Sequence, residues 1–308
     1  MNRFFLFSAL LILASGCSVR KLAINKIGDA LASGNSVFAT DPDPELVREA
    51  AAFSLKLTES LIAQSPRHAG LLVTASSGFT QYAYGFLQQD ADRIEDMDFL
   101  QAEAIRTRSR GLYLRGRDYG LRGLQARHPK VKDAPGQVKN LAAAATKRDV
   151  PLLYWTAVSW AAAISISKNK PALIAGLPQA EMLMDRALAL DESFSDGAIH
   201  SFLISYEPSR PSGTGDPLAR SRLHFEQAVK LSKEHLASPY VAMAETVSEQ
   251  TQNRAEFESL LRQALAIDVD FKPEWRLENL LMQQRARWLL SKEDDLFLDP
   301  IPTEKVNP

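Results

Sequence analysis

Arg186-Ala187-Leu188-Ala189-Leu190-Asp191 is the stretch whose pattern decides the fold class. An alanine followed by apolar residues and a polar turn recurs in Glu226-Gln227-Ala228-Val229-Lys230-Leu231 and in Arg262-Gln263-Ala264-Leu265-Ala266-Ile267-Asp268. The central alanines, Ala187, Ala228 and Ala264, are separated by 41 and 36 residues. A small alanine lets one helix approach its neighbour closely, and the flanking apolar residues fill the joint. We therefore expect repeated helical hairpins that stack, because a single hairpin cannot bury its own apolar face.

The rest of the chain carries the same helical pattern. Asp43-Pro44 and Asp216-Pro217 each offer an N-cap followed by a proline at the first helical position, and Asn253 with Glu256 has the spacing of a capping box. The predicted helices are 22–34, 44–64, 68–88, 96–127, 135–147, 151–168, 178–190, 195–205, 217–232, 238–250, 254–267 and 273–291. The repeat spacing is close to the tetratricopeptide period of about 34 residues. The prediction is an all-α fold of stacked helical hairpins, a cryptic tetratricopeptide-like α-solenoid.

Composition excludes several classes of function. The 308 residues include 36 Lys and Arg against 37 Asp and Glu, and this balance gives no basic excess for binding nucleic acid. One cysteine excludes an internal disulfide and a cysteine-based zinc site. The five histidines show no metal-ligand spacing, so we expect structural or surface roles for them, and no catalytic motif is present. We therefore predict a protein that is not an enzyme and that needs no cofactor or metal.

The N-terminus has the features of an export signal. Arg3 precedes an apolar run over residues 4–13, which is too short to span a bilayer, and small residues lead into Cys17. Residues 1–16 are predicted to be a lipoprotein signal peptide with Cys17 as the lipidated first residue of the mature chain. The alternative is a free or buried thiol. We expect residues 17–43 to form a tether and first helix, 44–291 the helical domain with an exposed loop at 207–216, and 292–308 a poorly ordered tail.

The predicted long helix 96–127 carries glycines on one stripe and arginines around its surface. Gly116 and Gly123 alternate with larger apolar residues, a pattern that suits close helix packing. The arginines are spread over the helix rather than gathered in a stripe. They indicate a solvated, ion-paired surface, with subunit or partner pairing as the alternative.

Several segments in order resemble one known family. They are Ser76-Ser77-Gly78-Phe79-Thr80-Gln81-Tyr82-Ala83-Tyr84-Gly85-Phe86, Asp96-Met97-Asp98-Phe99, Leu112-Tyr113-Leu114-Arg115, Tyr154-Trp155, Gly197-Ala198-Ile199-His200, His224-Phe225 and Asn279-Leu280. Their order and spacing over residues 45–290 are similar to the T component of TRAP transporters, a tetratricopeptide-type lipoprotein. The resemblance implies an all-helical periplasmic lipoprotein that forms a homotrimer, has a channel in each protomer and binds the TRAP substrate-binding (P) subunit. Ser18 after the cysteine favours the outer membrane.

Two groups of residues are candidates for lining such a channel. The first contains Phe79, Tyr82, Tyr84 and Phe86 together with Trp155 and Trp160, since Tyr and Trp combine an apolar body with a polar tip. The second contains Gln284, Arg287 and Trp288 on one helix face, where the arginine could bind a carboxylate. Core packing is the alternative for the first group, and an ordinary solvated face for the second.

Three functions remain for the whole chain. The first is an accessory lipoprotein that docks the P subunit and helps deliver a small hydrophobic or carboxylate-bearing ligand. The second is a tetratricopeptide-type envelope scaffold without a ligand of its own. The third, a hydrolase of envelope polymers, is disfavoured because no paired catalytic motif is present.

Overall fold

The computed structural model describes residue 26 and residues 37–131 and 136–298. The described residues form helices and no strand, which confirms the all-α prediction. They divide into two compact units with the boundary between Glu192 and Ser193, whereas the sequence analysis treats 44–291 as one helical domain. No helix in the described ranges is both long and apolar enough to cross a membrane.

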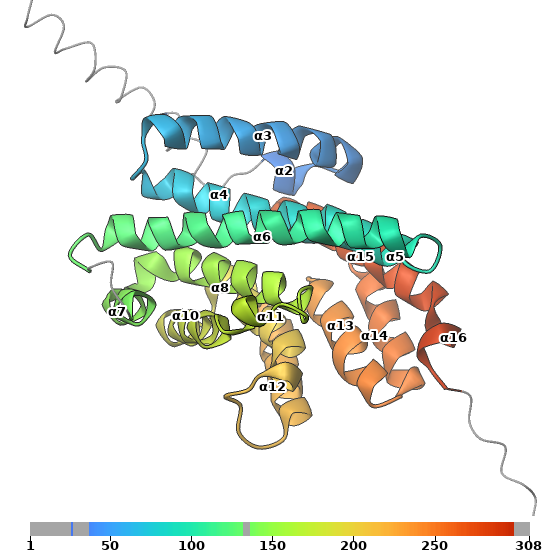
Figure 1. Cartoon of the computed structure of the whole chain (residues 1–308). Helices are drawn as coiled ribbons and strands as arrows, with labels where there is room; N and C mark the ends of the chain where they lie inside the picture. The colour runs from blue at the N-terminus through green and yellow to red at the C-terminus, as the bar shows by residue number, and fades with distance from the viewer. Residues whose placement is uncertain (1–25, 27–36, 132–135, 299–308) are drawn as a thin grey trace, which may run out of the picture. The chain divides into compact units, whose positions relative to one another are not determined.

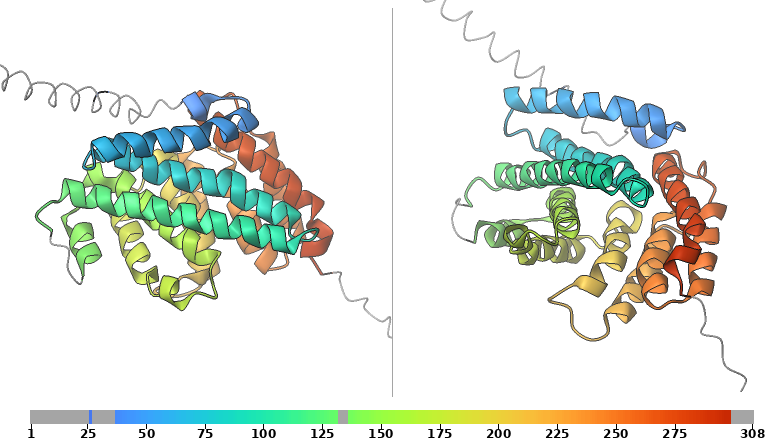
Figure 2. Two further views of the ribbon diagram at one scale, coloured as in Figure 1. Left: turned by 45° about the horizontal axis from the view of Figure 1, so that its top comes forward. Right: turned by 45° about the vertical axis from the view of Figure 1, so that its right-hand side comes forward.

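The first unit is a stack of helices joined in sequence (Figure 1). Its elements are α2 (Val37–Thr40), α3 (Pro44–Gln64), α4 (Ala69–Tyr82), the π-helix η1 (Ala83–Gln88), α5 (Gln89–Ile94), α6 (Phe99–Arg127), α7 (Gln137–Ala144), α8 (Val150–Ser165), α9 (Pro171–Ile174) and α10 (Leu177–Leu190). α4 packs between α3 and α6, and α8 packs between α6 and α10. The two views in Figure 2 show the same layering.

The second unit continues with further hairpins. Its main elements are α11 (Ala198–Tyr206), α12 (Pro217–Leu231), α13 (Ser238–Met243), the π-helix η5 (Ala244–Ser248), α14 (Arg254–Ala266), α15 (Arg276–Ser291) and α16 (Glu293–Leu296). α11 contacts α12 and α13, α13 contacts α14, and α14 contacts α15. Ala228 and Ala264 are fully buried in this unit, as Ala187 is in the first. The repeated alanine therefore sits at helix joints, as the pattern predicts.

The capping residues in the sequence correctly predict the first residues of α3, α12 and α14. The Asp43 carboxylate accepts from the amides of Glu45 and Leu46, and α3 begins at Pro44 as predicted. Asp216 caps α12, and Asn253 Oδ1 accepts from the Glu256 amide. The expected capping box is only half formed, because the Glu256 carboxylate instead accepts from Arg222 and Ser248. A nearby guanidinium attracts a carboxylate more strongly than a single backbone amide does.

Close packing in the first unit depends on small residues. An added Cβ at Gly116 would collide with the hydroxyls of Thr80 on α4 and Ser159 on α8. One at Gly123 would collide with Leu152. The stripe predicted for the helix over 96–127, observed as α6, therefore serves helix packing.

Other boundaries differ from the predictions. The helix predicted for 68–88 passes through the π-helical turn and continues as α5 to Ile94, and the short helices α9 and α16 are additional. The tail is ordered further than expected, because Phe297 is buried against Phe257 with ring centroids 5.0 Å apart. The predicted helix 22–34 except Lys26, the signal peptide, Cys17 and residues 299–308 lie outside the described residues.

Candidate ligand and partner site

The aromatic segment of α4 and η1 is largely built into the first unit. Phe79 is 2% exposed and stacks on Tyr119 at 5.9 Å between ring centroids, while the Arg115 guanidinium lies 4.5 Å from its ring centre. Phe86 is also buried, and the Arg48 guanidinium lies 5.0 Å from it. Packing accounts for both phenylalanines, and a channel role for them stays a prediction.

The two tyrosines of this segment are more accessible. Tyr82 is half-buried and packs 5.7 Å from the ring of Phe86. Tyr84 is 42% exposed. Tyr84 follows directly on the start of the π-helix at Ala83, where the wider turn changes which residues face the core. Of the four aromatic residues predicted here, Tyr84 is therefore the best placed to meet a ligand or partner.

The tryptophans of α8 lie at the edge of the core. Trp155 and Trp160 are both half-buried. The Trp155 ring makes an edge-on contact with Tyr154 at 4.9 Å. Arg117 lies 5.2 Å over the Trp160 ring, and the backbone at Gly176 passes so close to that ring that no side chain would fit there. Packing thus fixes both indoles in part.

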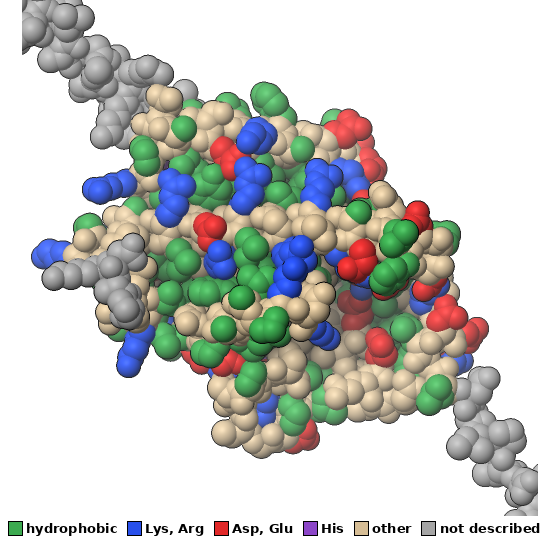
Figure 3. All heavy atoms as spheres, in the orientation of Figure 1, with side chains coloured by type: hydrophobic (Ala, Val, Ile, Leu, Met, Phe, Trp, Pro, Cys, Tyr) green, Lys and Arg blue, Asp and Glu red, His purple; other side chains and the backbone are tan. Residues whose placement is uncertain are grey.

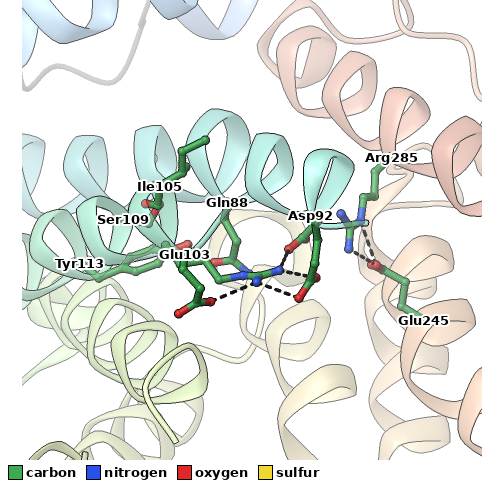
Figure 4. A network of polar contacts seen from close by, with 10 residues as sticks. Gln88, Asp92, Glu103, Ile105, Ser109, Tyr113, Glu245 and Arg285 are labelled. Carbon is green, nitrogen blue, oxygen red and sulfur yellow. Dashed lines mark hydrogen bonds and ion pairs between the residues drawn. The ribbon is translucent and has the colours of Figure 1, made fainter. Parts of the chain in front are cut away.

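The π-helix η1 also positions polar groups that sequence reasoning missed. Gln88 Oε1 accepts a 2.7 Å hydrogen bond from the hydroxyl of Tyr113, a fully buried residue of α6 (Figure 4). Burial raises the pKa of the Tyr113 hydroxyl well above its usual value, so it acts as a neutral donor. The neighbouring Gln89 is buried and accepts from Arg93. π-helical turns often occur at functional sites, and no sequence motif marks this one.

An arginine clamp holds the turn between α5 and α6. Arg106 donates to Glu95 at 2.5 and 2.9 Å, to Glu103 at 3.2 Å and to Asp92 at 3.3 Å, and Figure 4 shows the last two carboxylates. The hydrogen bond from Arg106 lowers the pKa of Glu95. Both partners are therefore charged over the physiological pH range. This arginine confirms the ion-paired interpretation of the predicted helix 96–127.

In the second unit, α15 carries the other predicted group. Arg287 is exposed, while Gln284 and Trp288 are half-buried. Arg285 on the same helix is half-buried; it donates to Glu245 Oε1 at 2.6 and 2.8 Å and lies 4.3 Å from the centre of the Trp288 ring (Figure 4). Glu245 comes from the π-helix η5. Each unit thus has a π-helical turn that presents a polar side chain to a neighbouring helix.

A model of the family described as TRAP transporter T-component matches residues 40–297. The chain belongs to this family. It is also similar to an uncharacterized protein of Treponema pallidum (strain Nichols), with 29% identity over 307 residues that cover 94% of this chain and 95% of that protein. As a T component it is associated with TRAP transport in the cell envelope. Every predicted channel residue lies inside the matched range, and Cys17 lies before it.

The histidines of this T component occupy structural positions. His68 Nδ1 accepts from the amide of Leu71 at the start of α4. His128 Nε2 lies 3.0 Å from the Asp149 carboxylate, and the His235 ring stacks on Phe271. The remaining two, His200 and His224, contact each other. No group of His, Cys, Asp or Glu in the described ranges is placed to hold a metal ion.

The described part of this T component has hollows on its surface. One, of about 670 Å³, lies in the second unit and is lined by Phe225, Glu226, Val229, Lys230, Lys233 and Glu234. Another, of about 390 Å³, lies in the first unit and is lined by Gly136, Gln137, Val138, Lys139, Pro178, Gln179 and Met182. Neither is lined by a predicted channel residue.

Proposed function

We propose that this chain is a non-enzymatic T component that docks the substrate-binding P subunit of a TRAP transporter and helps deliver a small ligand. The observation that carries the proposal is the family match over residues 40–297, which spans both helical units. Stacked helical hairpins form extended surfaces on which a second protein can lie. This architecture is suited to binding a partner protein rather than to catalysing a reaction on a substrate.

The ligand class follows from the side chains that remain accessible. Tyr84 is exposed and Trp155 is half-buried, each with an apolar ring and a polar tip, and Arg287 presents an exposed guanidinium. Such groups recognise a hydrophobic or carboxylate-bearing molecule. Within the first unit, the proposed lining residues are Phe79, Tyr82, Tyr84, Phe86, Trp155 and Trp160, of which the two buried phenylalanines would support the wall. Within the second unit, the proposed ligand-contacting residues are Gln284, Arg287 and Trp288.

The location belongs to the same proposal. Lipidation at Cys17 would anchor the chain on the periplasmic side of the envelope, and Ser18 favours the outer membrane. Each buried methylene of an acyl chain contributes about 0.8 kcal/mol, so two or three chains would hold the protein firmly. The anchored protein would act as a homotrimer.

The test is purification of the intact lipoprotein from its own envelope, followed by identification of the bound protein and bound small molecule by mass spectrometry. The expected result is a periplasmic substrate-binding subunit and a hydrophobic or carboxylate-bearing compound. Gel filtration with the purified P subunit should then show co-elution at micromolar concentration. Recovery of other envelope proteins without any small molecule would favour the scaffold function, and absence of co-elution would count against P-subunit docking.

A further inference from the structure

The turn between α5 and α6 exposes three large apolar side chains next to one another in the sequence. Met97 is 80% exposed, Phe99 59% and Leu100 80%. We call these three residues the apolar knob. The charged residues of 95–103 that surround it, Glu95, Asp96, Asp98 and Glu103, are all acidic. Figure 3 shows hydrophobic and acidic side chains together over this end of α6.

The knob is held in a defined conformation. Asp98 caps α6 by accepting from the amide of Gln101 at 2.9 Å. The Arg106 clamp ties the last residues of α5 to the first turns of α6 through Glu95, Asp92 and Glu103. A turn whose backbone is already fixed need not be ordered on docking, which is the property of a preorganised binding element. The macrodipole of α6 explains an acidic N-cap, but it does not explain three exposed apolar side chains beside it.

The opposite end of α6 has the complementary character. Gln137 at the start of α7 donates to Gln125 in the last turns of α6 at 2.6 Å, so the hollow of about 390 Å³ beside α7 and α10 lies at this end (Figure 1). We call it the α7–α10 hollow. Val138, Pro178 and Met182 give it an apolar lining, and Lys139 is at its edge. Among the described residues of 127–148, the exposed charged side chains are all cationic: Arg127, Lys130, Lys139, Lys147 and Arg148.

We propose that the apolar knob of one protomer docks into the α7–α10 hollow of a second copy of this chain. The acidic residues beside the knob then face Lys139 at the edge of the hollow, and Phe99 and Leu100 meet Val138, Pro178 and Met182. A chain cannot make this contact with itself, because the 29 residues of α6 separate the two ends by about 43 Å. The contact is head-to-tail, so that each copy offers one knob and one hollow and a ring can close.

The charges favour a protein occupant over a membrane. Asp96 and Asp98, the two carboxylates beside the knob that lie outside the Arg106 clamp, would be repelled by anionic lipid headgroups. Both surfaces required for self-association, in contrast, are present in the same chain with opposite charge. The inference deepens the self-association in the proposed function and assigns its surfaces.

The test compares three variants of the full-length protein in detergent by native mass spectrometry over a range of concentrations. Leu100→Glu alters the knob, and Lys139→Glu combined with Pro178→Glu alters the hollow. Leu223→Glu is the matched control, because Leu223 is 61% exposed on α12 and belongs to neither surface. The knob and hollow variants should each raise the concentration needed for assembly at least tenfold, and the control should assemble like the wild type. Circular dichroism should show the same helix content in all of them.

The decisive measurement is made on a mixture of the knob variant and the hollow variant. A knob variant and a mass-labelled hollow variant should form a mixed dimer at a concentration at which neither assembles alone, because one intact knob still meets one intact hollow. Absence of the mixed dimer, wild-type assembly by the variants, or a wild type that stays monomeric would overturn the inference.

Co-elution with the P subunit, measured on the same variants, separates this inference from the proposed function. If the knob variant assembles normally but loses the P subunit, the knob serves that partner and the inference fails while the proposed function stands. If the wild type assembles through the knob but binds no P subunit, the proposed function fails while the inference stands.

Discussion

His200 and His224 face each other with their Nδ1 atoms 2.9 Å apart, which requires one ring to donate and the other to accept. Glu207 lies nearby with Oε1 3.9 Å from His224 Nε2, and it accepts from Arg210 at 2.9 Å and from Arg220 at 2.5 Å. Burial, the neighbouring His200 and the two arginines lower the pKa of His224 to about 4, although Glu207 opposes the shift. This group of side chains anchors the start of the 207–216 loop to α11 and α12.

The first prediction concerns stability against pH. His224 stays neutral in the folded protein down to about pH 4, whereas its pKa in the unfolded chain is about 6.5. The unfolded state therefore binds more protons between these values, and stability should fall as pH drops through this window. The expected loss is about 2 kcal/mol after allowance for partial exposure. Urea unfolding of wild type and His224→Asn at pH 7.0, 5.5 and 4.5 should show a shallower fall in the variant; equal slopes would contradict this.

A second prediction concerns the close packing of α6. A methyl group at Gly120 would collide with the Thr156 hydroxyl of α8, so Gly120→Ala should lower the free energy of unfolding by about 1–3 kcal/mol. Gly111 on the same helix is the matched control, because it has open space around it. Gly111→Ala should raise stability by about 0.5–1 kcal/mol through the better helix propensity of alanine. Equal effects in urea unfolding would show that the close approach is absent.

The third prediction concerns Asn279, a buried residue of α15. Its Oδ1 accepts from the amide of Ala237 at 2.9 Å, and its Nδ2 donates to the carbonyl of His235 at 3.0 Å. Asn279→Leu leaves both backbone groups without these bonds, and the expected loss is about 2–4 kcal/mol. Arg287→Ala, an exposed change on the same helix, should stay within about 0.5 kcal/mol of the wild type. Faster hydrogen exchange at the Ala237 amide should accompany the loss; unchanged exchange would rule out this role.

The fourth prediction separates core from ligand path in the aromatic segment. Phe79→Ala should cost about 3–5 kcal/mol, because the ring is buried between Tyr119 and Arg115. Tyr84→Ala should cost less than about 1 kcal/mol, since Tyr84 is 42% exposed. It should nevertheless reduce the amount of small molecule that co-purifies with the protein, quantified by mass spectrometry. A Tyr84→Ala protein that retains its full ligand content would remove this residue from the path.

The fifth prediction concerns anchoring at Cys17. Wild-type protein should incorporate labelled palmitate and fractionate with membranes, whereas Cys17→Ser should give an unlabelled, unprocessed or released product. The physical reason is that the lipid thioether can form only at a cysteine thiol, and Cys17 is the single cysteine of the chain. A wild type that never incorporates the label would exclude lipidation.

Much of the helix layout could be predicted from the sequence because its causes are local. Asp43 and Pro44 define the start of α3 within three residues, and Asp216 with Pro217 does the same for α12. The repeated alanines are buried, because a residue without a long side chain is needed wherever two helices cross closely. A helix cap and the helical period each depend on residues within one or two turns of one another. The interacting residues are therefore close together in the sequence and can be recognised there.

The candidate site depended on contacts between distant segments. The sequence singles out Arg287, but Arg285 is the residue that pairs with Glu245, forty positions away in a π-helical turn without a sequence signal. Phe79 and Tyr84 belong to the same aromatic segment, and the packing of the surrounding helices buries the first and leaves the second exposed.

The sequence by itself determined the helices, their caps and the close helix joints. Only the tertiary structure decided the division into two units, the π-helical turns and the pairing of the buried charges. The physical reason is that hydrogen bonds within a helix are set by neighbours along the chain. The burial of an arginine or an aromatic ring is set instead by whichever helix packs against it.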